Sequence, residues 1–173
     1  MRRLLLWAPL GAFALVFALV LSGLLRPAER TVRSAMVGKP APALALAPLL
    51  PDRPGVTLQG SGGPRLVNVF GSWCLPCIAE APQLLRLKAA GARIEGIALR
   101  DTPGAVRAFL AENGDPYAAI GDDKASRAML ALGASGVPET FVIDARGVIV
   151  DQHIGDIRAD DVPRLLAALE KAR

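Results

Sequence analysis

The sequence predicts a mixed α/β domain with helices around its sheet, preceded by one N-terminal membrane helix. Three observations predict this architecture. Strand-like and helix-like segments alternate early in the chain, a pair of strands follows, and one long apolar run precedes them all. The length of 173 residues leaves room for one folded domain of ordinary size.

The apolar run lies at the N-terminus. Leu4–Leu25 holds 22 residues without a charge, and 18 of them are apolar. A helix of that length spans about 33 Å, enough for a hydrocarbon core of about 30 Å. We therefore expect a membrane anchor at residues 1–33, with its helix at about 4–25, and a folded domain at 34–173. A cleaved signal peptide is the alternative, but its apolar region is normally shorter, and residues 24–27 form a poor cleavage site.

The net charge of +4 also lies at the N-terminus. Residues 1–33 contain five arginines and one glutamate, whereas the rest of the chain contains 15 basic and 15 acidic residues. A neutral domain lacks the basic surface of a nucleic-acid binder, so we expect no nucleic-acid partner. Arginines flank the apolar run on both sides, so the charge count does not settle the orientation of the anchor.

Apolar runs and turn residues predict the elements of the domain. Buried strands are expected at 65–70 and 94–99, a hairpin at 140–143 and 148–154, and helices at 74–90, 103–113, 125–132 and from Asp160 onward. The early alternation requires a parallel crossover, and the hairpin adds antiparallel strands, so the sheet is mixed. Residues 56–58 are compatible with one more short strand, and Asp122-Asp123 are expected to cap the next helix.

Cys74 and Cys77 are the only cysteines, and they form a C-x-x-C motif. A zinc site needs about four ligands, and His153 is the only histidine that could add to the pair. Covalent haem attachment requires a histidine where Ile78 stands. A purely structural disulfide across so short a loop would stabilise the fold little. A redox dithiol is therefore the favoured interpretation, and we expect neither a metal nor a cofactor besides the reversible disulfide.

The position of the motif suits this chemistry. It follows a buried strand and opens a helix, whose N-terminus stabilises a thiolate on the first sulfur. Thiolate is the attacking species in disulfide exchange. We expect both cysteines to be catalytic, with Cys74 as the nucleophile and Cys77 as the resolving residue. Leu75 and Pro76, between them, set the local geometry and so tune the reduction potential.

These residues resemble the thioredoxin superfamily. Residues 73–77 match its redox motif, Pro82 matches its helix-kinking proline, and residues 137–140 match its cis-proline loop. The resemblance implies a thioredoxin-like fold in which Val137, Pro138 and Glu139 bind the partner. It also implies a cis Pro138, although X–Pro statistics alone favour trans.

The closer similarity is to the membrane-anchored thiol:disulfide interchange proteins of cytochrome c maturation, the CcmG/DsbE type. The apolar N-terminus carries it, together with Gly38–Pro42, Trp73–Glu80, 109–117 and Gly133–Phe141. This resemblance implies a dedicated reductant at the inner membrane, with its domain in the periplasm. It would take electrons from a membrane thiol-electron carrier and reduce cysteines of apocytochrome c or of a haem-ligation protein.

Two departures from these families bear on the site. Many thioredoxins have a buried Asp where this chain has Asn68, which cannot titrate. The resemblance implies that Glu80 takes part of that role, which requires burial and a raised pKa; a solvated acid at a helix start is the alternative. The second departure is Ala134-Ser135, where the family often has a bulkier pair.

Two further residues allow a functional and a structural interpretation. Trp73 either shields Cys74 and contacts partners, tuning the redox site, or packs ordinarily. Glu139 either recognises partners or makes a structural hydrogen bond. For the whole protein, the alternatives are another membrane-anchored thioredoxin-like reductase, a general disulfide oxidoreductase, or a membrane-tethered binding module with a structural disulfide.

Overall fold

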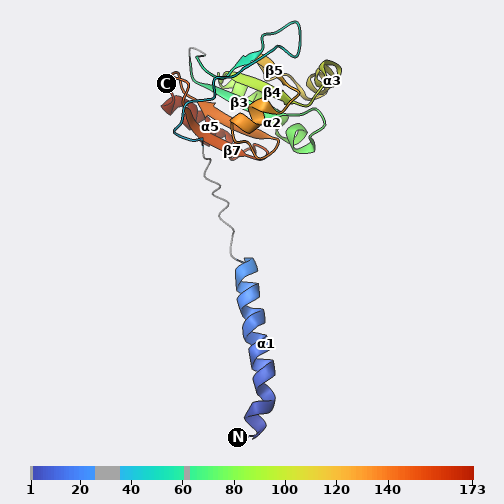
Figure 1. The fold of residues 1–173 in the computed structure, drawn as a ribbon, viewed down its shortest axis with the longest axis vertical. Coiled ribbons are helices and arrows are strands. Elements are labelled where there is room, and N and C mark those ends of the chain that lie inside the picture. Colours follow the sequence, from blue (N-terminus) through green and yellow to red (C-terminus); the bar gives the residue numbers. More distant parts are fainter. Residues whose placement is uncertain (1, 26–35, 61–62) are drawn as a thin grey trace. The chain divides into compact units, whose positions relative to one another are not determined.

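The computed structural model describes residues 2–25, 36–60 and 63–173. The chain forms two compact units, Met1–Arg33 and Ser34–Arg173. In the first, the described residues form helix α1 (Arg2–Leu25), drawn in blue in Figure 1. Among the residues described, no helix is both long and apolar enough to cross a membrane. The membrane anchor thus stays a prediction.

A five-stranded mixed sheet is the centre of the second unit. Its strands are β3 (Arg65–Phe70), β4 (Ile94–Leu99), β5 (Ala119–Asp123), β6 (Glu139–Ile143) and β7 (Ile149–Ile154). The order across the sheet is β5-β4-β3-β6-β7. Strands β3, β4 and β5 are parallel, whereas β6 is antiparallel to β3 and β7 is antiparallel to β6. The predicted mixed sheet is confirmed, and Figure 1 shows β3 and β4 between β5 and β7.

Helices and a short hairpin cover the sheet. The helices are α2 (Leu75–Ala89), α3 (Pro103–Asn113), α4 (Arg127–Ala131) and α5 (Val162–Lys171), and the hairpin pairs β1 (Ala45–Leu46) with β2 (Val56–Thr57). Side chains of α2, α3 and α5 share one buried cluster with one face of the sheet. The other face packs against α4 and the hairpin.

Alternation along β3 decides which residues reach each face. Leu66 and Phe70 belong to the cluster under α2, whereas Val67 and Val69 belong to the opposite cluster. Side chains two residues apart point to the same face of a strand, so Asn68 lies on the α2 face with Leu66 and Phe70. Strand β3 thus directs one amide toward α2, on the same face as two apolar side chains.

Strand β5 is the main element that the sequence did not predict. Ala119–Asp123 contains one β-branched residue, a glycine and two acids, so its composition is typical of a loop. It forms an edge strand because Gly121 leaves room for the hairpin; a Cβ there would lie 2.7 Å from the Leu46 side chain. The expectation of a helix at 125–132 was too long, since α4 covers Arg127–Ala131. Asp123 ends β5, is buried, and accepts the backbone N–H of Met129 near the start of α4.

Candidate active site

The two cysteines lie at the junction between β3 and α2. They form a disulfide with a Cα–Cα distance of 5.3 Å. Cys74 is the N-cap of α2, and its Sγ accepts the backbone N–H of Cys77 at 3.2 Å. Pro76 lies in the first turn, where its missing N–H costs nothing. The predicted placement of the first sulfur at a helix N-terminus is therefore confirmed.

The disulfide is buried, whereas two apolar side chains next to Cys74 in the sequence are exposed. Cys74 is 4% exposed and Cys77 is 1% exposed, whereas Trp73 and Leu75 are 58% and 78% exposed. The Trp73 indole N–H donates a weak hydrogen bond to the carbonyl of Leu99 at 3.3 Å. A large apolar surface therefore lies beside a disulfide that itself presents little area.

Glu80 lies one turn further along α2 than Cys77 and is fully buried. Its Oε1 accepts an N–H of Asn68 at 2.9 Å, and its Oε2 accepts the backbone N–H of Ile157 at 3.0 Å. Burial raises the pKa of Glu80 to about 7, although both hydrogen bonds oppose the shift. The burial required for the redox-tuning hypothesis is present, and the solvated alternative is wrong.

Asn68 connects Glu80 to a buried tyrosine. The Tyr117 hydroxyl donates to Oδ1 of Asn68 at 2.7 Å, and Nδ2 of Asn68 also donates to Oγ1 of Thr140 at 2.9 Å. Burial raises the pKa of Tyr117 well above its usual value, so the phenol stays protonated and remains a donor. This bond orients the amide so that its NH₂ group donates to Glu80 and to Thr140.

Gly96 makes room for that contact. It pairs with Asn68 across β3 and β4, and a Cβ at this position would lie 3.0 Å from the Tyr117 ring and 2.8 Å from Phe70. The rings of Phe70 and Tyr117 stack with centroids 4.7 Å apart. The absence of a side chain at Gly96 therefore leaves space for the Tyr117 ring, whose hydroxyl reaches the Asn68 amide on the neighbouring strand.

The proline loop lies at the same end of the sheet as the dithiol. Val69 pairs with Glu139, so the residues that precede β6 adjoin the loop that follows β3. The Val137–Pro138 bond is cis, as the resemblance implied. Val137 packs against the buried cluster that contains both cysteines. The carbonyl of Pro138 accepts the backbone N–H of Gly155 at 3.0 Å.

Glu139 faces inward. Its Oε2 accepts the backbone N–H of Ser135 at 2.9 Å and the Ser135 hydroxyl at 3.2 Å, and its Oε1 accepts an amide N–H of Gln152. Burial raises the pKa of Glu139. The side chain has no exposed area, and the structural hydrogen bonds expected as the alternative are present. Any part of Glu139 in partner binding would act through the loop that it braces.

Sequence reasoning missed Tyr117 and Thr140 as parts of this site. Tyr117 is 49 residues from Asn68 and Thr140 is 72 residues away, so no local pattern joins them. The one available signal was Asn68 itself, a polar residue inside a strand of otherwise apolar residues after Arg65. A buried amide requires partners, and strand pairing supplies them.

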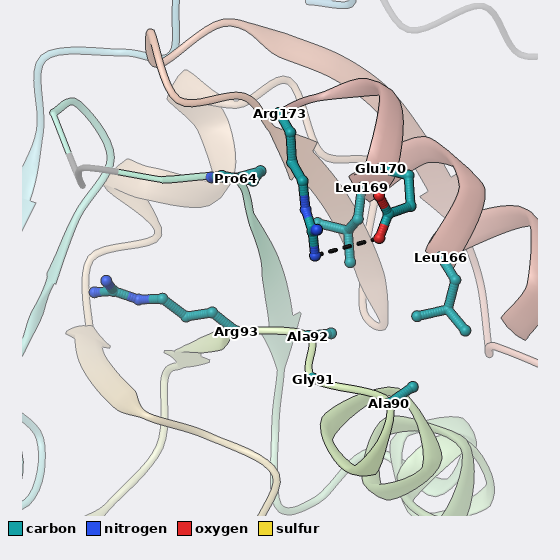
Figure 2. Close-up of a pocket in the computed structure, with 9 residues that line it drawn as sticks. All are labelled: Pro64, Ala90, Gly91, Ala92, Arg93, Leu166, Leu169, Glu170 and Arg173. Atoms are coloured by element: carbon teal, nitrogen blue, oxygen red, sulfur yellow. Dashed lines mark ion pairs between the residues drawn. The ribbon is translucent and has the colours of Figure 1, made fainter.

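The described part of the chain offers no metal site. No group of three or more His, Cys, Asp or Glu residues in residues 2–25, 36–60 and 63–173 could hold a metal ion. Figure 2 shows a cavity of about 50 Å³ that Pro64 and the end of α5 line, with an ion pair between Arg173 and Glu170. Pro64 precedes β3, so this cavity lies at the opposite end of that strand from Cys74.

The fold and this site define a protein thiol-disulfide oxidoreductase with a thioredoxin-like architecture. The family described as Redoxin matches residues 36–169. The chain is 39% identical over 137 residues to the thiol:disulfide interchange protein HelX of Rhodobacter capsulatus. This alignment covers 79% of this chain and 78% of the relative. It is 38% identical to the thiol:disulfide interchange protein DsbE of Escherichia coli K12, over 91% of this chain and 88% of the relative.

Solved structures share this fold. A putative DsbE from Chlorobium tepidum superposes with a TM-score of 0.62 at 25% identity, covering 77% of this chain and 94% of that one. A DsbF homologue from Corynebacterium diphtheriae gives 0.66 at 24% identity, covering 83% and 96%. The chain belongs to the Redoxin family and, within it, to the DsbE-type thiol:disulfide interchange proteins.

Proposed function

We propose that this protein is a membrane-anchored reductant that faces the periplasm and reduces cysteine pairs during cytochrome c maturation. The observation that carries the proposal is the placement of Cys74 as the N-cap of α2, with Cys77 and then Glu80 behind it on the same buried face. This arrangement provides a stabilised thiolate, a resolving thiol and a proton acceptor in sequence along one helix.

The reaction is a two-step exchange. The Cys74 thiolate attacks one sulfur of a partner disulfide; a Cys74–partner disulfide forms, and the other partner sulfur leaves as a thiolate. The Cys77 thiol then loses its proton and attacks the Cys74 sulfur, so the mixed disulfide breaks. The partner gains two electrons and, after protonation, two thiols, while the pair becomes the observed disulfide. A membrane thiol-electron carrier would reduce the pair again.

Glu80 is the proposed proton acceptor for Cys77. The two residues are three positions apart on α2, which places them on one face of the helix. A pKa of about 7 suits a group that must take up and release protons near neutral pH. Asn68 and Ile157 donate hydrogen bonds to the carboxylate form, so the network is ready to hold the charge before proton transfer.

Trp73, Leu75 and the cis-proline loop form the proposed partner-binding surface. The two exposed apolar side chains flank Cys74 in the sequence, and Val137 and Pro138 lie at the same end of the sheet. An extended peptide that carries cysteines could rest on the apolar side chains while its sulfur reaches Cys74. Pro76 restricts the backbone between the two cysteines, and we assign it a role in setting the reduction potential.

The cellular setting is proposed from the resemblance to CcmG/DsbE proteins and from the 22-residue apolar run at Leu4–Leu25. In that setting the substrates are apocytochrome c or a haem-ligation protein, and no metal or cofactor takes part besides the disulfide. The direction of transfer depends on the potential of the pair relative to its partners.

A trapping experiment tests this proposal. In the native host, full-length protein with Cys77→Ser cannot resolve the mixed disulfide, so partners remain attached to Cys74 and can be identified by mass spectrometry after acid quenching. Cys74→Ser is the matched control and should trap nothing. Adducts dominated by apocytochrome c or a haem-ligation protein support the proposal.

The other outcomes separate the alternatives. Adducts with many unrelated proteins would indicate a general oxidoreductase. One oxidase-assembly protein would indicate a different anchored reductase. No adduct at all, with Cys74 accessible to alkylation, would contradict the redox proposal and leave a structural disulfide.

A further inference from the structure

The loop that carries Cys74 depends on a neighbouring strand end for its position. It runs from Phe70, the last residue of β3, to Cys74, the N-cap of α2. Its own backbone supplies one hydrogen bond, from Cys74 N–H to the carbonyl of Gly71 at 3.1 Å. Because β3 and β4 are parallel and Phe70 pairs with Ala98, this loop lies beside the residues that follow Ala98.

Asp101 binds the loop with both of its oxygens. Its Oδ2 accepts the backbone N–H of Ser72 at 2.6 Å, and its Oδ1 accepts the Ser72 hydroxyl at 2.9 Å. Oδ1 also accepts the backbone N–H of Thr102, the N-cap of α3, at 2.8 Å. Asp101 is buried and lies next to the N-terminus of α3.

The backbone just before Asp101 also contacts the loop. The carbonyl of Leu99 accepts the Trp73 indole N–H. Arg100, between these two acceptors, has a φ of 47°, in the left-handed region that non-glycine residues rarely adopt. Its Nε donates to the Ser126 hydroxyl at 2.8 Å, and its N–H donates to the carbonyl of Asp123 at 3.3 Å. Strained residues of this kind persist where the surrounding structure holds them and concentrate at functional sites.

We propose that Asp101 is a positioning residue for the redox dithiol, acting through Ser72 to hold the Cys74 sulfur at the N-terminus of α2. This inference rests on the proposed function. Ser72 is two residues before Cys74, so its paired hydrogen bonds restrict where the first sulfur can lie. If the loop loosens, Cys74 spends time away from the helix N–H groups that stabilise its thiolate, and the thiolate fraction falls.

The chain offers a matched control in Asp144. This buried carboxylate also braces a turn, accepting the backbone N–H groups of Arg146 and Val148 at 2.9 Å and 2.8 Å. It follows Ile143, which pairs with Arg65 at the start of β3, so it lies at the opposite end of the sheet from Cys74. Asp144→Asn should affect stability without affecting the reactivity of Cys74.

The experiment measures the alkylation rate of Cys74 by iodoacetamide in the reduced full chain, with mass spectrometry distinguishing the two cysteines. The pH is held below the pKa of an unperturbed cysteine thiol, about 8.5, so that the rate reports the thiolate fraction of Cys74. Ser72→Ala and Asp101→Asn should each slow the reaction about threefold or more, because a smaller fraction of Cys74 is thiolate. The double variant should be no slower than the slower single variant, because both changes break the same link. Ser72→Thr, which keeps the hydroxyl, should retain the original rate.

Two results would overturn the inference. The first is equal alkylation rates in Asp101→Asn, Ser72→Ala, Asp144→Asn and the original chain. The second is a faster rate in Asp101→Asn with no change in Ser72→Ala, which would show that the Asp101 charge acts and its hydrogen bonds do not. Failure of the proposed function is a separate result, because it would appear as thiol-disulfide interchange that survives Cys74→Ser.

Discussion

Asn68 donates an N–H to Glu80 across 2.9 Å in the interior of the domain, directly behind the helix that carries both cysteines. The amide cannot titrate, so it donates to the carboxylate without competing for the proton. Burial raises the pKa of Glu80 to about 7, and the Asn68 bond limits that rise. The site thus has one group that exchanges a proton near neutral pH and one fixed donor that orients it.

The raised pKa of Glu80 makes stability depend on pH. The folded-state pKa lies above that of an exposed glutamate, so the unfolded chain releases this proton first as pH rises. The free energy of unfolding should therefore be greatest below about pH 4.5 and fall by about 3 kcal/mol by pH 7 through this group alone. Glu80→Gln should remove that part of the decline, which urea unfolding of the oxidised chain at a series of pH values measures.

Glu112 supplies the control for this prediction. It is an exposed carboxylate on α3, so Glu112→Gln is the matched control for the loss of one carboxyl group. A profile of Glu80→Gln that runs parallel to that of the original chain between pH 4.5 and 8 would contradict the titration assigned to Glu80.

Asn68→Asp should place two buried carboxyl groups in contact. The new oxygen would replace a donor 2.9 Å from Oε1 of Glu80, and like charges in a dry site disfavour double ionisation. We expect one proton to remain on the pair well above pH 7, and the stability loss between pH 5 and 8 to be larger than in the original chain. Carboxyl carbon chemical shifts followed by NMR report the titration directly, and two independent titrations near pH 4 would refute the expectation.

Trp73→Ser should separate partner binding from stability. The indole is more than half exposed and makes one weak hydrogen bond, so its loss should change the free energy of unfolding by about 1 kcal/mol or less. The rate of reaction with a peptide disulfide should fall because apolar contact area beside Cys74 is lost. Val37→Ser is the control, since Val37 is also exposed and precedes Gly38, which bonds to Ile149 at the far end of the sheet. Equal rates in both variants would exclude Trp73 from partner contact.

Glu139→Gln should weaken the loop that contains the cis proline. The new amide group would place N–H donors opposite those of Ser135 or Gln152, so at least one buried donor loses its acceptor. We expect a loss of about 1–3 kcal/mol in the free energy of unfolding. Hydrogen exchange at Ser135 should accelerate relative to exchange within β3. Unchanged protection of the Ser135 amide would show that Glu139 does not brace the loop.

Local patterns predicted most of the sheet and the position of the dithiol. The apolar runs at β3 and β4 and the capped start of α3 are properties of neighbouring residues, so the sequence reveals them directly. Strand β5 was missed because its edge position tolerates glycine and acids. It forms through pairing with β4 and contact with the β1–β2 hairpin, and both of these are tertiary properties.

The interior of the site was only partly predictable for a related reason. Glu80 could be singled out by its spacing from Cys77 and by the resemblance, and its predicted role requires the burial that the structure has. The Tyr117 and Thr140 bonds to Asn68 depend on strand register and on the space at Gly96, which are tertiary properties. The same holds for Asp101, whose link to Ser72 follows from the parallel pairing of β3 with β4.

The most direct test of the account is a single-turnover reaction of the reduced full chain with a peptide disulfide of the Cys-x-x-Cys-His type. We predict that the original chain reduces the peptide with one disulfide formed in the protein per peptide reduced. Cys77→Ser should stop at a mixed disulfide whose mass is the sum of protein and peptide. Cys74→Ser should form no mixed disulfide with the peptide. Reduction of the peptide by Cys74→Ser at the original rate would contradict the assignment of Cys74 as the nucleophile and, with it, the proposed mechanism.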